Sequence, residues 1–147
     1  MQQHPENDLI YLLTSLEAAE KITIYRSPFF NALEFFESED QLHFNASLLL
    51  IATFGDRISK VSNTTKEKYP AIPWLQIKGM HNRIVHDYDG VDFELTFIIV
   101  THEIPRLISD LQEVIRIELK AGNFSFEELN VARNSSWYRH IDFDAIS

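Results

Sequence analysis

The sequence predicts an all-α protein, namely an up-down four-helix bundle with a short C-terminal helical extension. Apolar residues recur at helical spacing in four long segments, and no segment alternates apolar and polar residues for more than a few positions. Short or moderate loops connect the segments, as in antiparallel bundles. At 147 residues the chain can bury a sufficient core without disulfides or structural zinc. We expect residues 1–121 to form the bundle and residues 122–147 to pack on it.

The first helix carries leucines at positions 9, 12, 13 and 16, which is the stripe of an amphipathic helix. Asn7 or Asp8 can cap its first turn. Pro28 prevents the helix from continuing, because proline lacks an N–H donor and restricts the residue before it. We expect a loop there, with a short helical turn at residues 29–36.

The second helix is predicted at residues 39–62. Ser38 and Gln41 have the spacing of a capping box, in which hydroxyl and amide satisfy reciprocal backbone donors. Gly55 lies on the apolar stripe, where a missing side chain permits close approach of a neighbouring helix. The polar stretch at residues 62–70 is expected to end the helix.

A third helix is predicted to begin near Pro73 and to stop at residues 87–90. Asp92 then caps a long fourth helix, which ends at Gly122. Pro105 lies inside this helix and should kink it, or split it in the preceding turn.

The C-terminal extension differs in character from the bundle. It holds a short helical candidate at residues 126–131 and then the aromatic and basic cluster Trp137-Tyr138-Arg139-His140. The simpler interpretation is that these rings pack back onto the bundle. The alternative is a stacking platform for a base, or a contact with a partner.

The chain has 13 Lys and Arg residues against 22 Asp and Glu residues, a formal charge of −9. This charge argues against broad electrostatic binding of nucleic acid, so any RNA contact must be local. Cysteine is absent, which excludes disulfides and thiolate chemistry. The first residues lack the pattern of a signal peptide, and no apolar run is long enough to span a membrane. We therefore expect a cytoplasmic protein without membrane contact.

Polar and charged side chains concentrate at the end of the third helix and in the loop after it. Residues 81–92 contain two histidines, one arginine, one tyrosine and three aspartates. These residue types suit metal-free cleavage of RNA, which needs a base for the 2′-hydroxyl, an acid for the leaving oxygen and a cation over the phosphate. His86 lies near a helix C-terminus that favours positive charge, and Arg83 shares its helix face. The same residues can instead be the polar, solvent-exposed end of a bundle helix, with no catalytic role.

A metal site is not expected in this segment. His81 and His86 are five residues apart and diverge by about 140° around a helix, whereas a helical metal pair needs i, i+4 spacing. No third ligand is evident, and no serine lies in the glycine-rich elbow of a nucleophile. We therefore predict neither a bound metal nor a cofactor.

A distinctive series of residues lies between positions 69 and 92. It consists of Tyr69-Pro70-Ala71-Ile72-Pro73-Trp74, Ile77, Gly79-Met80, Asn82-Arg83-Ile84-Val85-His86-Asp87-Tyr88 and Gly90-Val91-Asp92. This series resembles the HepT toxins of the HEPN superfamily, whose members are helical-bundle ribonucleases. The resemblance extends over about residues 7–120.

The resemblance implies a homodimer with an RNA-cutting cleft between two copies of a motif. The motif is arginine, four residues, histidine, one residue and tyrosine, so the histidine falls on His86 and the tyrosine on Tyr88. The arginine position is occupied by His81. The resemblance also implies a toxin–antitoxin system, in which an MntA-type nucleotidyltransferase antitoxin silences the toxin by attaching AMP to the tyrosine.

The histidine at the arginine position matters, because arginine is always charged and an ordinary histidine is mostly neutral above pH 7. Asp56, which resembles an acidic feature of the family, or Asp87 can act as a supporting partner that keeps His81 protonated. Three outcomes follow: Arg83 replaces the missing guanidinium, His81 and His86 divide the acid and base roles across the dimer, or the site is inactive. In the last case the protein is a non-catalytic interaction module with a degenerate site.

Overall fold

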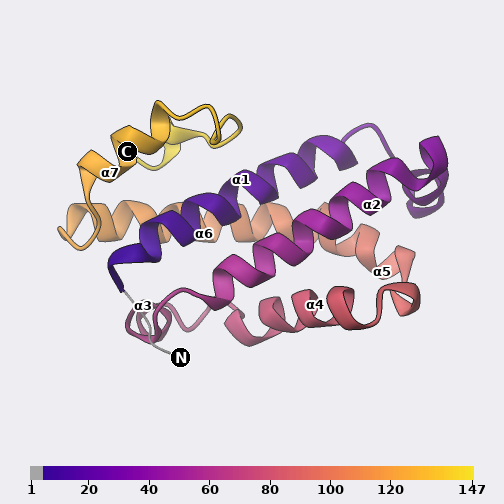
Figure 1. Ribbon diagram of the computed structural model, residues 1–147, viewed down its shortest axis with the longest axis horizontal. Coiled ribbons are helices and arrows are strands. Elements are labelled where there is room, and N and C mark those ends of the chain that lie inside the picture. Colours follow the sequence, from indigo (N-terminus) through magenta and orange to yellow (C-terminus); the bar gives the residue numbers. More distant parts are fainter. Residues whose placement is uncertain (1–4) are drawn as a thin grey trace.

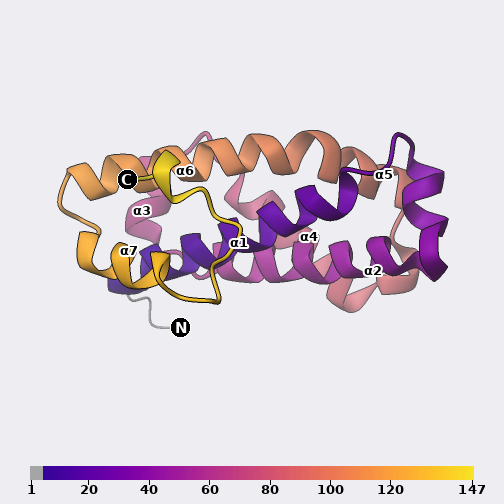
Figure 2. The same ribbon diagram turned by 90° about the horizontal axis from the view of Figure 1, so that it is seen from above.

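The computed structural model describes residues 5–147 and is all-helical there, which confirms the predicted fold class (Figure 1). The helices are α1 (Asp8–Arg26), α2 (Ala32–Ser59), α3 (Asn63–Lys68), α4 (Trp74–His86), α5 (Phe93–Ile98), α6 (Ile104–Lys120) and α7 (Phe126–Arg133). Four long segments run alternately in opposite directions, namely α1, α2, α4 and the pair α5–α6 (Figures 1 and 2). Within these residues, no helix combines the length and apolar character that a membrane crossing requires.

The apolar stripes of the helices meet in a shared core. α1 packs against α2 and α6, and α2 also packs against α4. Leu9, Leu12, Leu13 and Leu16 are buried, which confirms the stripe predicted for the first helix. In α4 only Ile77 is buried, so most of that helix remains accessible.

The start of α1 differs from the predicted cap. Asn7 makes no capping hydrogen bond through its side chain, and the buried Asp8 carboxylate turns to the α2–α3 connection. Its oxygens accept hydrogen bonds from Ser62 N at 2.9 Å, Ser62 Oγ at 2.6 Å and Thr65 Oγ1 at 2.6 Å. Because a buried carboxylate needs several donors, Asp8 fixes the end of α2 beside α1 instead of capping its own helix.

α2 changes direction at the predicted capping box, but with a different backbone geometry. Ser38 is extended, with φ −57° and ψ 134°, and residues 39–41 have φ between 49° and 68°. These left-handed angles cannot form the right-handed first turn of a capping box, so that part of the prediction is wrong. Phe35 and Phe44 pack edge to face across the break, with ring centroids 6.1 Å apart. This packing helps to hold the short first segment across the end of the bundle (Figure 2).

The polar stretch after α2 ends that helix, as predicted, and also forms the short helix α3, which was not predicted. Ser62 caps α3 by accepting a hydrogen bond from Thr65 N at 3.4 Å. Ser62 is an ordinary N-cap residue, but the helix after it has only six residues and no apolar stripe. The sequence therefore gives little indication of this helix.

Glu118 of α6 binds the last residue of α3 and the residue after it. It is buried and accepts hydrogen bonds from Lys68 Nζ at 2.8 Å and Tyr69 Oη at 2.9 Å. Burial raises the pKa of Glu118, but the hydrogen bonds from Lys68 and Tyr69 outweigh it and bring the pKa below its ordinary value of 4.5. Burial and the hydrogen bond to Glu118 raise the pKa of Tyr69 to about 12. The connection leading to α4 is therefore fixed on α6.

Pro105 splits the last long helix, as predicted. A π-helical turn at Ile99–Glu103 separates α5 from α6, and the proline lies in the first turn of α6. Pro105 has no N–H to donate, and the preceding N–H, of Ile104, donates to Ile99 O across the wider turn. Gly122, with φ 81°, ends α6, and the next N–H, of Asn123, donates to Glu118 O at 2.9 Å.

α7 and the residues after it pack along α1 and α6, on the side of the bundle opposite α4 (Figures 1 and 2). The Tyr138 hydroxyl lies 3.2 Å from Thr14 Oγ1. His140 donates its N–H to Glu17 at 2.8 Å, and its Nδ1 lies 2.6 Å from the same carboxylate. Trp137 is 70% exposed. Part of the aromatic and basic cluster therefore docks on the bundle, and within one chain it lies away from α4.

Candidate functional site

The candidate site is built on the close approach of α4 to α2. A side chain at Gly55 would place its Cβ 2.7 Å from His81 Cβ and 2.8 Å from Ile77 O, both on α4. Such distances are too short for real carbon contacts, so only glycine permits this packing. The close approach predicted for Gly55 is confirmed, and it places His81 directly against α2.

His81 is half-buried, and its ring is oriented by the backbone of α2. Its Nδ1 lies 2.7 Å from the carbonyl oxygen of Ala52. Because a carbonyl oxygen can only accept, Nδ1 carries the proton, and Nε2 is left as the ring nitrogen available for chemistry.

His86 is the last residue of α4 and is exposed. The adjacent Asp87 is also exposed, and its N–H donates to Arg83 O at 2.8 Å, which closes the last turn of the helix. His86 therefore lies where solvent or a ligand can reach it.

Tyr88 lies in the short 3-10 turn Tyr88–Gly90 and is 53% exposed. Its hydroxyl donates a hydrogen bond to Oδ1 of Asn45 on α2. The turn that follows α4 is thus bound to α2, although most of the tyrosine ring remains accessible.

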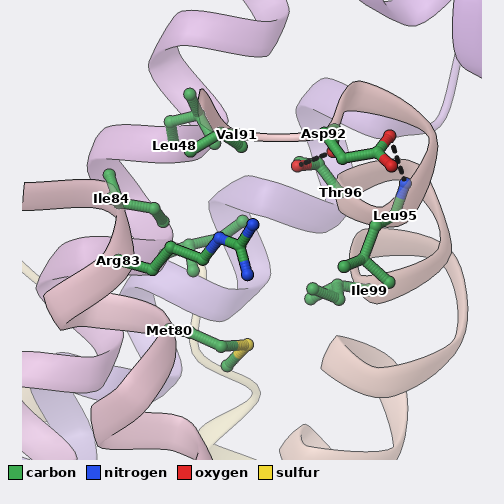
Figure 3. Close-up of a pocket in the computed structure, with 10 residues that line it drawn as sticks. Leu48, Met80, Arg83, Ile84, Val91, Asp92, Leu95, Thr96 and Ile99 are labelled. Atoms are coloured by element: carbon green, nitrogen blue, oxygen red, sulfur yellow. Dashed lines mark hydrogen bonds between the residues drawn. The ribbon is translucent and has the colours of Figure 1, made fainter. Parts of the chain in front are cut away.

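Arg83 points in another direction, into a pocket of about 50 Å³ between α4 and α5 (Figure 3). Met80 and Ile84 of α4 line this pocket together with Leu95 and Ile99 from the opposite side. Arg83 and His81 are two residues apart and therefore lie on different sides of α4. The structure brings Arg83 near the α5 side and His81 near the α2 side, with His86 exposed at the end.

The two aspartates predicted to support His81 contact other groups. Asp56 lies 3.4 Å from Lys60 Nζ and 3.9 Å from Arg57 Nη1, so it forms ion pairs with cations at the end of α2. Asp87 caps α4 through its backbone. Within residues 5–147, neither carboxylate is hydrogen-bonded to His81. The hydrogen-bond partner of the His81 ring there is the carbonyl oxygen of Ala52.

Sequence reasoning missed Asn45 and Ala52 as parts of the site. Asn45 offers no local signal, because it is a single polar residue on an amphipathic helix. Ala52 acts through its carbonyl oxygen, which is independent of its side chain. In the described part of the chain, no group of three or more His, Cys, Asp or Glu side chains is arranged to hold a metal ion.

The sequence also matches known proteins. The sequence model of a family described as Ribonuclease HepT-like matches residues 15–114, which is more than half of the chain. "Putative RNase MJ1216" of Methanocaldococcus jannaschii is 31% identical over 74 residues, covering 50% of this chain and 61% of that protein. "Putative RNase MJ0125" of the same organism is 28% identical over 71 residues, covering 48% and 61%.

"Probable ribonuclease HepT" of Thermococcus cleftensis is 29% identical over 62 residues, which cover 42% of this chain and 56% of that protein. The chain therefore spans about three fifths of the length of the curated relatives that it matches. No solved structure matches the chain significantly.

Proposed function

The chain belongs to the HepT-like ribonuclease family, and we propose that it is an RNA endonuclease that works without a metal ion. The observation that carries this proposal is the arrangement around α4. His86 is exposed at the end of the helix, and the residues on either side of it, His81 and Tyr88, are both held by α2. An imidazole can act as an acid or as a base near neutral pH, so two of them can supply both groups that acid–base cleavage of RNA requires.

The proposed reaction is a transesterification within the RNA chain. A base removes the proton of the 2′-hydroxyl, the 2′-oxygen bonds to phosphorus, and the bond from phosphorus to the 5′-oxygen breaks. The leaving 5′-oxygen takes a proton from the acid, so the products are a 2′,3′-cyclic phosphate and a 5′-hydroxyl. No external oxidant, reductant or water is consumed.

We assign the acid role to His86 and the base role to His81. His86 is exposed at the end of α4, and an imidazolium there can donate a proton to the leaving oxygen. His81 donates Nδ1–H to Ala52, and its neutral form therefore has a lone pair at Nε2 that can accept a proton. Arg83 is the less favoured phosphate contact, since its guanidinium points into the pocket towards α5 (Figure 3).

We further propose that two copies form a homodimer, so that the His81 of one copy and the His86 of the other meet in one cleft. Leu42 and Leu49 are 58% and 68% exposed and lie two turns apart on α2, on either side of Asn45. Burial of such an apolar strip beside Tyr88 would stabilise a symmetric pair. The pairing also brings both copies of the motif to one axis.

The proposed partner is an MntA-type nucleotidyltransferase antitoxin that attaches AMP to Tyr88. In that step the phenolic oxygen bonds to the α-phosphorus of ATP and pyrophosphate leaves. The exposure of the ring supports access, and an adenylate beside His86 would block RNA by bulk and negative charge. The protein would then act as the toxin of a toxin–antitoxin pair in the cytoplasm.

Cleavage of a structured RNA by the wild-type protein and by His86→Ala tests the ribonuclease function. We expect cleavage by the wild type in the presence of a chelator, and a loss of at least about a hundredfold in the variant. Equal behaviour of the two proteins would instead support the alternative, a non-catalytic module that presents α4 to a partner.

A further inference from the structure

Positive charge in this acidic chain is concentrated between residues 57 and 86. This segment has six of the 13 Lys and Arg residues but only one of the 22 Asp and Glu residues, Glu67. Three of the six cations lie within 4.0 Å of carboxylates outside the segment, and these are Arg57, Lys60 and Lys68. Arg83 lines the pocket between α4 and α5, so Lys66 and Lys78 are the cations left to give this part of a molecule of net charge −9 a local positive charge.

Lys66 of α3 and Lys78 of α4 place two positive charges near each other. Lys66 Nζ donates to Ser59 O at 3.0 Å. Burial lowers the pKa of Lys66 and the nearby Lys78 lowers it further, while Asp8 raises it. Lys78 has no ion-pair partner among residues 5–147. A bound anion would relieve the repulsion between these two ammonium groups.

An open groove of about 460 Å³ adjoins this charge, and both Lys66 and Trp74 line it. The Trp74 ring is half-buried, and its Nε1 donates to Tyr69 O at 3.0 Å, which fixes the orientation of the indole. Glu67 is the one acidic side chain in the lining. An aromatic ring beside a cation is the combination that binds single-stranded nucleic acid, because bases stack on the ring and phosphates contact the cation.

A ridge on α4 connects the groove with the proposed catalytic histidine. Lys78, Asn82 and His86 are all exposed and follow one another at i, i+4 and i+8, so they lie along one side of the helix. At 1.5 Å per residue, the distance from Lys78 to His86 along the axis is about 12 Å. A strand bound in the groove can therefore continue along the ridge to the site.

We propose that this groove and ridge bind single-stranded RNA next to the cleavage site, with a base stacked on Trp74 and phosphates contacted by Lys66 and Lys78. The proposal rests on the proposed ribonuclease function and names the surface that holds its substrate. It also explains how a chain of net charge −9 can hold a polyanion, since the contact is local.

Binding of a short labelled single-stranded RNA, measured by anisotropy over a salt series, tests the proposal. All proteins carry His86→Ala, so that the RNA is not cut and binding is separated from catalysis. We expect Lys78→Gln to weaken binding about fivefold at low salt and to reduce the slope of log K against log salt by about 0.7. The matched control is Arg139→Gln, which removes one exposed cation from the extension opposite α4 and should change neither quantity.

Stacking is tested by fluorescence in a Trp137→Phe background, which leaves Trp74 as the only tryptophan. Addition of RNA should quench its emission, and Lys78→Gln should shift the titration to higher RNA concentration. Unchanged emission with a salt slope unaffected by Lys78→Gln would overturn the RNA surface. If the wild type still cuts RNA and His86→Ala does not, the ribonuclease function stands even then, so the two failures are distinguishable.

Discussion

The contact between His81 Nδ1 on α4 and the carbonyl oxygen of Ala52 on α2, at 2.7 Å, is matched by a second contact seven residues away. There, the Tyr88 hydroxyl binds Asn45, which is also seven residues from Ala52. α2 and residues 81–88 therefore run antiparallel with equal spacing between the two contacts. His86 lies between the two contacts along the chain, so α2 holds the residues on both sides of the exposed imidazole.

Gly55→Ala should separate α4 from α2 and misplace both histidines. The new methyl group would lie 2.7 Å from His81 Cβ and 2.8 Å from a backbone oxygen. We expect a loss of about 1–3 kcal/mol in the free energy of unfolding and a fall in RNA cleavage of about tenfold to a hundredfold. Urea unfolding and a cleavage assay measure the two effects.

Gly79→Ala is the matched control for Gly55→Ala. Gly79 lies in α4 and is exposed, and a Cβ added at this position would meet no atom within 4 Å. Alanine should therefore raise the free energy of unfolding by about 1 kcal/mol through helix propensity, with cleavage unchanged. If the two alanines had the same effect, close packing at Gly55 would not be what positions the site.

Tyr88→Phe should abolish modification by AMP and leave the fold intact. The variant loses one exposed hydrogen bond, which contributes about 0.5–1.5 kcal/mol at most. Intact-mass measurement after co-expression with a nucleotidyltransferase should show added AMP on the wild type and none on the variant. Asn45→Ala removes the acceptor but keeps the hydroxyl, and should still be modified. AMP on Tyr88→Phe would place the acceptor elsewhere.

Features with a local cause could be predicted from the sequence. Pro105 lacks an N–H, so the helix is interrupted before it whatever the helix packs against. Gly122 ends α6 for a similarly local reason, its positive φ. The spacing of a motif selects His86 and Tyr88 as candidates without tertiary information, and their role stays a prediction.

Features that depend on distant partners could not be predicted. Asp8 has the sequence context of a cap, yet its donors come from Ser62 and Thr65, more than 50 positions along the chain. Similarly, the orientation of His81 depends on a backbone oxygen of α2, which leaves no trace in residue types. For Asp8, the cost of leaving a buried carboxylate without donors is larger than the stabilisation from one helix cap. The tertiary hydrogen bonds therefore decide where its side chain points.

Glu118→Gln should destabilise the protein in a pH-dependent manner. The pKa of Glu118 is lowered in the folded state, so its charged form stabilises the fold above the ordinary value of 4.5. This stabilisation is lost as the pH falls through the lower folded pKa. We expect the variant to lose about 1–3 kcal/mol near pH 7.

Thermal or urea unfolding between pH 7 and pH 3 measures this dependence. The difference between wild type and Glu118→Gln should shrink at the acidic end, where the wild-type carboxyl also becomes neutral. Glu127→Gln, at an exposed position of α7, provides the control and should show little effect at either pH. A constant difference across the range would mean that the charge of Glu118 does not contribute.

Leu49→Asp should dissociate the proposed homodimer. The side chain is 68% exposed on α2, and a buried carboxylate in an apolar interface would be strongly unfavourable. Sedimentation equilibrium should show a dimer for the wild type and a monomer without RNA cleavage for the variant. Val131→Asp, at a 74% exposed position of α7, should remain dimeric and active. A wild type that sediments as a monomer would contradict the proposal that two copies form one cleft.

The most direct measurement of the proposed chemistry is mass spectrometry of the ends of RNA fragments produced in the presence of a chelator. Attack by the 2′-oxygen with acid–base assistance from His81 and His86 predicts 2′,3′-cyclic phosphate and 5′-hydroxyl ends, and no cleavage at a position carrying a 2′-deoxyribose. Fragments with 5′-phosphate ends, or undiminished cleavage at the 2′-deoxy position, would contradict this mechanism.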